Sequence, residues 1–226
     1  LAIAKGLRGA GQDAVVLTAL DSIAWLANLR GGDVPYTPFT LSFGILHSDN
    51  RLVLYIDLRK VRPAVAQKIK DDVSLRPIDE FTMGLINLGQ QSANVRIDPA
   101  STAEAIHFCL KEAGAALAFD DDPCTIPKSL KNNIELEGIR AAHCRDGLAL
   151  TRFLAWLSRE TPSKGVTEMS ASECLETFRR EGANFRGLSF PTISGAGPNG
   201  AIVHYRVTSE SNRSLEMNSL YLVDSG

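Results

Sequence analysis

The sequence predicts a mixed α/β (α+β) protein with two separate cores. Short apolar strands alternate with helices through the first half, which is the pattern of an α/β layer that packs its own core. An acidic stretch with two prolines, residues 120–127, interrupts this pattern, and a long amphipathic helix follows it. We therefore expect the chain to divide between about residues 119 and 131.

Each element of the first half is predicted from its apolar pattern and from the turn residues that flank it. Ser101 and Glu104 have the spacing of a capping box, so they are expected to begin a helix. In chain order the predicted elements are a helix over residues 1–9, a strand over 14–17, a helix from Asp21 and Ser22 to Asn28, strands over 39–46 and 52–56, a helix after Pro63, a strand over 83–88 and a helix over 101–114.

The second half is predicted to begin with the long helix, residues 132–156, whose apolar positions recur at helical spacing. A second capping box, Ser170 and Glu173, is expected to begin a shorter helix that ends near Arg180. Three strands complete the prediction, over residues 187–194, 201–206 and 219–223.

The composition argues against several classes of partner. The formal net charge is -2, so there is no basic excess to attract nucleic acid. No apolar run approaches the roughly 18 residues that span a membrane, and no secretory signal pattern is visible. The four cysteines have no paired spacing, which favours free thiols in a reducing compartment. We therefore expect a cytoplasmic protein that binds neither nucleic acid nor membranes.

Residues 195–200, Gly-Ala-Gly-Pro-Asn-Gly, match the GxGxxG pattern of dinucleotide-binding sites. That pattern binds a pyrophosphate only where the glycines lead into a helix. Here they lead into Ala-Ile-Val-His-Tyr, which is typical of a strand, and Pro-Asn-Gly is typical of a turn. We therefore predict a turn between two strands and reject a nucleotide site.

Two polar residues near this turn have both a structural and a functional interpretation. His204 is expected in the middle of a strand, where a histidine is either buried and hydrogen-bonded or in contact with a substrate. Asp224 ends an apolar strand, where an aspartate either starts a turn or presents a carboxylate to a metal ion. The residue pattern alone leaves both alternatives open.

The two ends of the sequence are unusual for a complete protein. The chain begins at Leu1 inside a predicted helix and ends at Gly226 directly after an apolar run. Natural C-termini are more often polar tails or docked helices. We therefore expect this chain to be a piece of a longer protein.

Four segments resemble the aminopeptidase P enzymes, a family of proline-specific peptidases, and they occur in the family's order. Residues 190–206 resemble the family's strand–turn–strand, and Leu222-Val223-Asp224-Ser225-Gly226 is similar to the metal-binding strand that follows it. Residues 21–31 and 131–156 resemble further segments of the family.

The resemblance implies a fold and a domain organisation. Residues 1–126 would form a creatinase-N-terminal-like middle domain, which is an α/β layer. Residues 127–226 would form the first half of a pita-bread catalytic domain. The amino-terminal domain and the second catalytic half of such an enzyme would lie outside this chain.

The resemblance also implies an activity. Family members hydrolyse the bond between an N-terminal residue and a following proline, so peptides with proline at the second position are the expected partners. They use two divalent metal ions, manganese first with zinc or cobalt as alternatives, to activate a water molecule. Asp224 matches the first metal-binding aspartate, and His204 matches a catalytic, substrate-binding histidine that helps to stabilise the tetrahedral intermediate. A homodimer is one expected assembly of the whole enzyme.

Because the remaining metal ligands would follow Gly226, we expect this chain by itself to be inactive and to retain no metal pair. Two other functions share the pita-bread architecture. One is a non-catalytic module that binds peptides or histones, and the other is a creatinase-type amidinohydrolase. Retention of His204 and Asp224 argues against the first, and the match over the middle domain argues against the second.

Overall fold

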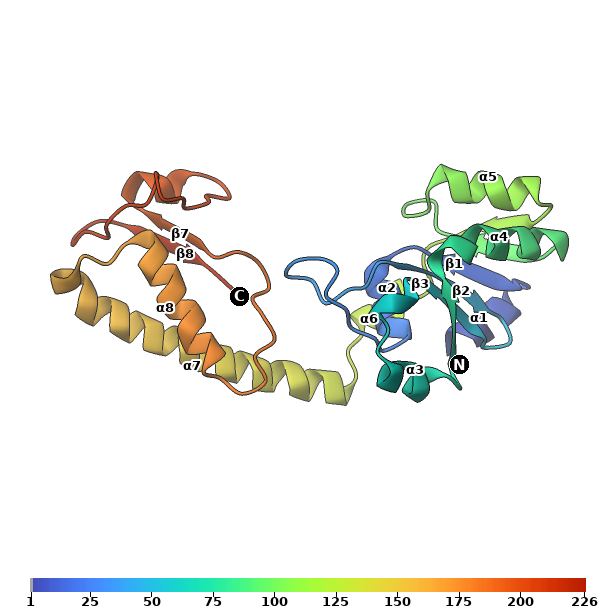
Figure 1. Ribbon diagram of the computed structural model, residues 1–226, viewed down its shortest axis with the longest axis horizontal. Helices are drawn as coiled ribbons and strands as arrows, with labels where there is room; N and C mark the ends of the chain where they lie inside the picture. The colour runs from blue at the N-terminus through green and yellow to red at the C-terminus, as the bar shows by residue number, and fades with distance from the viewer. Residues whose placement is uncertain (1) are drawn as a thin grey trace. The chain divides into compact units, whose positions relative to one another are not determined.

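The computed structural model describes residues 2–226 and divides the chain into two compact units. The first extends to Lys131, and the second is Asn132–Gly226 (Figure 1). Each unit has its own hydrophobic core. The domain boundary after residue 126 remains a prediction, and the short helix next to it, α6 (Thr125–Ser129), belongs to the first unit.

A six-stranded mixed sheet forms the centre of the first unit, with the strand order β4-β3-β2-β1-β5-β6. β2 pairs antiparallel with both β1 and β3, and the remaining three pairs are parallel. The strands are β1 (Ala14–Leu17), β2 (Ser42–His47), β3 (Leu52–Ile56), β4 (Val73–Pro77), β5 (Asn94–Ile97) and β6 (Ala116–Phe119).

Helices cover both faces of this sheet. The other helical elements are α1 (Ala2–Gly9), α2 (Leu20–Leu26), α3 (Pro63–Ile69), α4 (Phe81–Gln90), α5 (Glu104–Glu112) and two short 3₁₀ turns, η1 (Leu58–Lys60) and η2 (Ile78–Glu80). α4 and α5 pack on one face, and α1 and α2 contribute to the core on the other.

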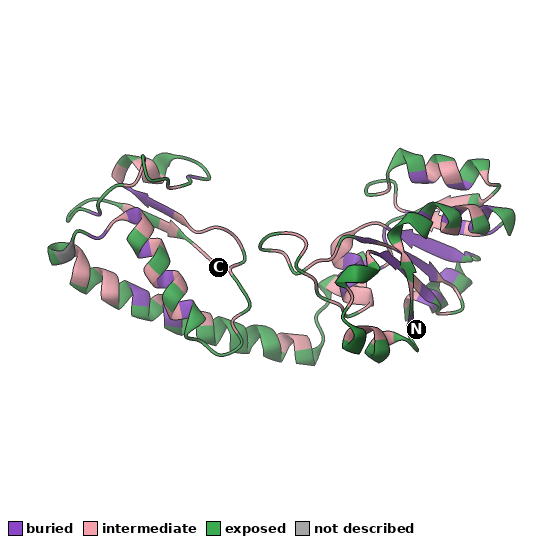
Figure 2. Cartoon of the chain, in the orientation of Figure 1, coloured by how far each residue is buried: buried purple, intermediate pink, exposed green. Residues whose placement is uncertain are grey.

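The sequence of strand β1 reflects the burial of both faces of the sheet. Ala14 and Val16 belong to the core under α4 and α5, whereas Val15 and Leu17 belong to the opposite core. All four residues are therefore buried, and Figure 2 shows much of this sheet in purple. A strand covered on both faces has no polar alternation, which explains its continuous apolar run.

Two predictions for the first unit are wrong. Residues 83–88 were predicted as a strand but lie in α4, where Phe81, Leu85 and Leu88 face the core at helical spacing. A short apolar run does not distinguish a buried strand from a buried helix. Helix α5 begins at Glu104 after Ala103 without a side-chain cap, so the predicted capping box does not form.

The second unit packs two helices against a two-stranded antiparallel sheet. Its core contains Phe153 from the first helix, Leu175 from the second and Ala196 from the sheet. The elements are α7 (Asn133–Lys164), α8 (Glu168–Arg180), β7 (Ile193–Ala196), the 3₁₀ turn η3 (Gly197–Ala201) and β8 (Tyr221–Asp224).

The caps of α7 and α8 set where each helix begins. The Asn132 side chain accepts a hydrogen bond from the Glu135 amide at 2.9 Å, and the Glu135 carboxylate accepts one from the Asn132 amide at 2.8 Å. Thr167 and Ser170 form the equivalent capping box of α8. Ser170 is therefore the third residue of that helix and not its cap, so the box predicted from Ser170 and Glu173 is wrong.

No helix within residues 2–226 is long and apolar enough to cross a membrane.

The strand predicted over residues 201–206 is also absent. After η3 the chain turns, and His204 adopts a left-handed backbone conformation with φ of 54°. The strand-like side chains of Ile202 and Val203 are 53% and 83% exposed. β8 overlaps most of the strand predicted over residues 219–223, whereas β7 shares only residues 193 and 194 with the strand predicted over 187–194 and continues to Ala196.

The close approach of α4 and α5 predicts a measurable difference between two glycine substitutions. A Cβ on Gly89 would lie 2.3 Å from the Ala113 Cβ and 2.6 Å from Ala113 backbone atoms. Gly89→Ala should therefore lower the free energy of unfolding by about 1–3 kcal/mol. Gly6 in α1 has open space around it, so Gly6→Ala should raise that free energy by about 0.5–1 kcal/mol.

Urea unfolding of the first unit measures both effects. The signal is the fluorescence of Trp25 in a Trp156→Phe background, because these are the two tryptophans of the chain. If Gly89→Ala stabilises the unit as Gly6→Ala does, the tight packing of α4 against α5 is wrong.

The cysteines are expected to differ sharply in reactivity. Cys124 is fully buried, and burial, reinforced by Asp122, raises the pKa of its thiol to about 12. At pH 8 only roughly one such thiol in 10⁴ is ionised, and the thiolate is the reactive form. Iodoacetamide should therefore modify the exposed Cys144 quickly and Cys124 only after denaturation. Peptide mass spectrometry measures both, with Cys144→Ser as control, and fast labelling of native Cys124 would contradict its burial.

Candidate functional site

The glycine-rich turn, residues 195–200, which comprises the end of β7 and most of η3, is held by its own backbone. A Cβ on Gly195 would lie 2.9 Å from both the Cα and the amide nitrogen of Gly200. Gly197 adopts a positive φ of 53°, which favours glycine. Gly197 and Gly200 lie within η3, a 3₁₀ turn of five residues, and within the described residues no α-helix follows Gly195. These glycines therefore allow the turn to pack tightly on itself.

Glu168, in the first turn of α8, is the centre of the hydrogen-bond network around this turn. Its side chain is fully buried. The carboxylate accepts hydrogen bonds from the Ala196 amide at 2.6 Å and from Asn199 Nδ2 at 3.0 and 3.2 Å. It also accepts bonds from the Tyr205 hydroxyl at 2.9 Å and the Arg213 amide at 3.1 Å.

These donors keep Glu168 ionised although it is buried. Burial alone raises the pKa of a carboxyl group. The bonds from the Ala196 amide, Asn199, the Arg213 amide and Tyr205 outweigh that effect and hold the pKa of Glu168 below its ordinary value. The positive end of the α8 dipole also favours an anion in this first turn.

His204 projects from the turn that follows, beside an anchored neighbour. His204 is exposed, whereas the adjacent Tyr205 is only 6% exposed. The Tyr205 hydroxyl lies 2.8 Å from Asn199 Nδ2 and 2.9 Å from Ser211 Oγ, in addition to its bond to Glu168. The position predicted for His204, the middle of a strand, is therefore wrong, and a left-handed turn presents it instead.

Asp224 is the last residue of β8 and is exposed. It pairs in register with Ile193 of β7. Its carboxylate makes no hydrogen bond or ion pair with any other side chain that the structure describes. The chain just after it is anchored, because Ser225 Oγ accepts a hydrogen bond from Arg179 at 3.1 Å and the Gly226 carbonyl accepts one from the Ser189 amide at 2.9 Å.

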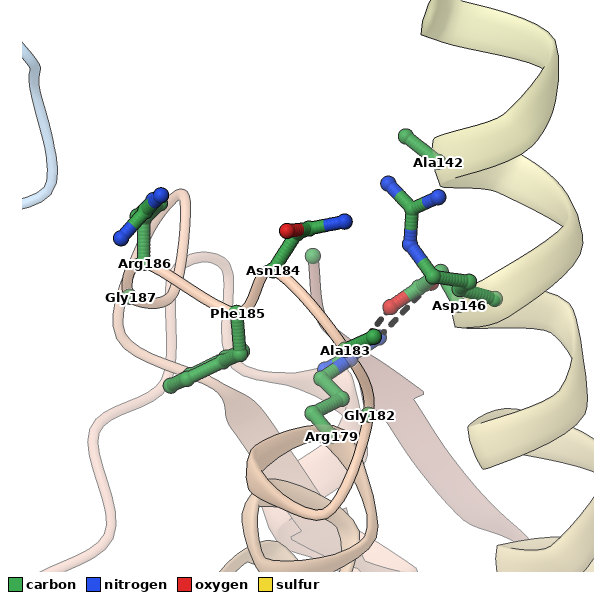
Figure 3. Close-up of a pocket in the computed structure, with 11 residues that line it drawn as sticks. Ala142, Asp146, Arg179, Gly182, Ala183, Asn184, Phe185, Arg186 and Gly187 are labelled. Atoms are coloured by element: carbon green, nitrogen blue, oxygen red, sulfur yellow. Dashed lines mark hydrogen bonds and ion pairs between the residues drawn. The ribbon is translucent and has the colours of Figure 1, made fainter.

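Arg179 also joins this segment to α7. Its guanidinium, with only 3% of the side chain exposed, contacts the Asp146 carboxylate at 2.7 and 3.2 Å. Figure 3 shows this pair at the edge of a cavity of about 210 Å³, which Gly226 also lines. Neither His204 nor Asp224 lines that cavity.

Within residues 2–226 no hydrogen bond joins His204 to Asp224, and no three His, Cys, Asp or Glu side chains form a group that could hold a metal ion. Sequence reasoning missed Glu168 and Arg179. An acid in the first turn of a helix is usually a solvated, dipole-stabilising residue, so the sequence contained little to mark Glu168 as buried.

Two protein families match the chain in succession. The family described as Creatinase/Prolidase N-terminal domain matches residues 1–135, and Metallopeptidase family M24 matches residues 137–226. "Probable Xaa-Pro aminopeptidase P" of Paracoccidioides brasiliensis is 39% identical over 224 residues, covering 93% of this chain and 36% of that protein. "Xaa-Pro aminopeptidase 1" of Dictyostelium discoideum is 35% identical over 228 residues, covering 99% of this chain and 36% of that protein.

Solved structures show the same likeness. X-prolyl aminopeptidase from Caenorhabditis elegans, described as a cytosolic enzyme with a di-nuclear active site, superposes with a TM-score of 0.92 at 30% identity. The match covers 100% of this chain and 37% of that one. Prolidase from Pyrococcus furiosus, at 16% identity with a TM-score of 0.67 over 99% of this chain and 60% of its own, supports the fold alone.

The chain thus spans a little over one third of the length of the aminopeptidases that it matches. These comparisons confirm the predicted mixed α/β class and the resemblance to aminopeptidase P. The chain belongs to the Xaa-Pro aminopeptidase P family, as a creatinase/prolidase N-terminal domain followed by part of an M24 domain of pita-bread fold.

Proposed function

We propose that this chain is part of a metal-dependent aminopeptidase that hydrolyses the bond between an N-terminal residue and a following proline. Support comes from the relatives named for that activity and from the likeness to the C. elegans enzyme over the whole chain. On the same grounds we propose peptides with proline at the second position as substrates and the cytosol as the compartment. A homodimeric assembly of the whole enzyme remains a prediction.

The observation that carries this proposal is the presentation of Asp224. Its carboxylate is exposed at the end of a strand, and the residues after it are tied to α8 and to Ser189. A carboxylate oxygen suits a manganese ion, and zinc or cobalt accept it as well. A single carboxylate cannot hold two ions, so further ligands from a longer polypeptide would have to complete the site.

The bound ions would supply a water molecule whose pKa is lowered towards ~7, ready to attack the scissile carbonyl. Asp224 would hold one side of that centre. His204, whose imidazole is exposed beside an anchored turn, would contact the substrate and donate a hydrogen bond to the carbonyl oxygen as negative charge develops on it.

The 226-residue chain by itself should retain no pair of manganese ions and cleave no Xaa-Pro peptide, because Asp224 lacks partner ligands within residues 2–226. Metal analysis after dialysis and a hydrolysis assay measure this. A longer polypeptide of the same protein that cleaves the same peptide is the control. Two bound ions per 226-residue chain, or turnover by it, would contradict the assignment of Asp224 as one ligand of an incomplete set.

In a longer, active polypeptide, His204→Ala and Asp224→Ala should fail in different ways. Loss of a group that stabilises an oxyanion lowers turnover by about 10²–10³, so His204→Ala should be slow with both metal ions bound. Asp224→Ala should instead lose or disorder the metal site. Turnover, metal content and melting temperature are measured for both variants. Normal turnover by His204→Ala, or loss of its metals, would contradict the substrate contact.

A further inference from the structure

Among the residues that the structure describes, Glu168 is a buried anion without a cationic partner. Among the ion pairs of the residues that the structure describes, none involves Glu168. Four separate donor groups surround its carboxylate instead, namely two backbone amides, one side-chain amide and one hydroxyl. Taking a carboxylate out of water is costly unless such donors satisfy it. Each donor must therefore stay in place for the carboxylate to remain buried.

The four donors come from separate segments of the chain, which the carboxylate joins in addition to their other contacts. Ala196 ends β7, Asn199 lies in η3, and Tyr205 and Arg213 lie in irregular chain further on. A hydrogen bond to an ionised group is stronger and more directional than a neutral one. An apolar side chain in place of Glu168 could fill the same space, but it would leave the Ala196 and Arg213 amides without this acceptor, and Asn199 and Tyr205 with only their contacts to each other and to Ser211.

The hydrogen bond between Tyr205 and Glu168 also restrains the backbone of the adjacent residue, His204. Burial raises the pKa of the Tyr205 hydroxyl, so it stays protonated and can donate to Glu168. With Tyr205 fixed, the preceding residue has little freedom, and it adopts the sparsely populated left-handed conformation, φ 54°. Such a conformation is unfavourable for a residue with a side chain and persists only where the surroundings enforce it.

We propose that Glu168 is a positioning residue, which acts through Tyr205 and Asn199 to fix the turn that presents His204 to the substrate. This proposal rests on the function proposed above for His204. Glu168 itself touches neither substrate nor metal in this assignment. It decides where the His204 imidazole lies when a peptide arrives.

The ionisation of Glu168 gives the network a defined pH limit. Because its folded pKa is lowered, the carboxylate contributes stability above its unfolded pKa of about 4.5, and this contribution is lost as pH falls through the lower folded value. Glu168→Gln has no such titration, so its melting temperature should fall less steeply than that of the wild type below pH 4.5. The fluorescence of Trp156 in a Trp25→Phe background reports the melting of this unit. If the melting temperatures of the wild type and of Glu168→Gln fall equally steeply below pH 4.5, Glu168 is not ionised in the folded state.

The position of the turn can be tested in the 226-residue chain without any assay of activity. The ¹⁵N relaxation of the His204 backbone amide should give a rigid order parameter of about 0.85 in the wild type. In Glu168→Gln and Tyr205→Phe it should fall towards about 0.6 or below. The matched control is Tyr221→Phe, because the Tyr221 hydroxyl bonds to Ser194 and not to the Glu168 carboxylate. Rigid His204 in both test variants would overturn the proposal.

A double-mutant cycle in a longer, active polypeptide tests the consequence for turnover. Glu168→Gln and Tyr205→Phe should each lower kcat by roughly 10- to 100-fold, since small misplacements of a reacting group have effects of this size. Metal content should be unchanged. In a His204→Ala background the same two substitutions should lower kcat by less than about 2-fold, because the residue through which they act is gone. A merely structural role would give the same loss in both backgrounds.

The outcomes separate this proposal from the one on which it rests. One outcome is that His204→Ala is impaired, but Glu168→Gln and Tyr205→Phe lower kcat by the same factor with and without His204. This outcome would overturn the positioning role of Glu168 and leave the role of His204 intact. Normal turnover by His204→Ala would overturn both. If Glu168→Gln does not fold, Tyr205→Phe decides, because it keeps the aromatic ring and removes only the hydroxyl that contacts Glu168.

Discussion

The second unit depends on one requirement, which is that the buried carboxylate of Glu168 must be surrounded by hydrogen-bond donors. The amides of Ala196 and Arg213 reach it from two segments that are distant in sequence. The Tyr205 hydroxyl, from the chain between them, donates to the same carboxylate, so this chain folds back towards Glu168 and does not form the predicted strand. The glycine-rich turn, η3 and the left-handed turn at His204 are the path that satisfies all these donors at once.

The first unit depends on a different constraint, which is apolar and non-directional. Its sheet is covered by helices on both faces, and the central strand β1 contributes two residues to each core. Its buried Asp122 accepts a backbone hydrogen bond from the Cys124 amide, whereas four donor groups surround Glu168 in the second unit. The unit is therefore held by packing, whereas the candidate site is held by directed polar contacts.

The sequence was sufficient where a pattern is local. Strand β1 follows from an apolar run with two β-branched residues, and the long helix α7 follows from its amphipathic spacing. It was insufficient where tertiary contacts decide. Residues 201–206 have strand composition, but the bond from Tyr205 to Glu168 draws the chain into a turn. Residues 83–88 are apolar enough for either state, and only the packing of α4 on the sheet selects the helix.

The contact of Arg179 with Asp146 and Ser225 has a consequence for how a metal ion would be captured. A strand end that is free to fray would have to be ordered at the moment of binding, with a loss of conformational entropy. Arg179 restrains the residue next to Asp224 before any ion arrives. If Asp224 is a ligand, this guanidinium, which never touches the ion, lowers the entropic penalty of coordination and so strengthens affinity through preorganisation.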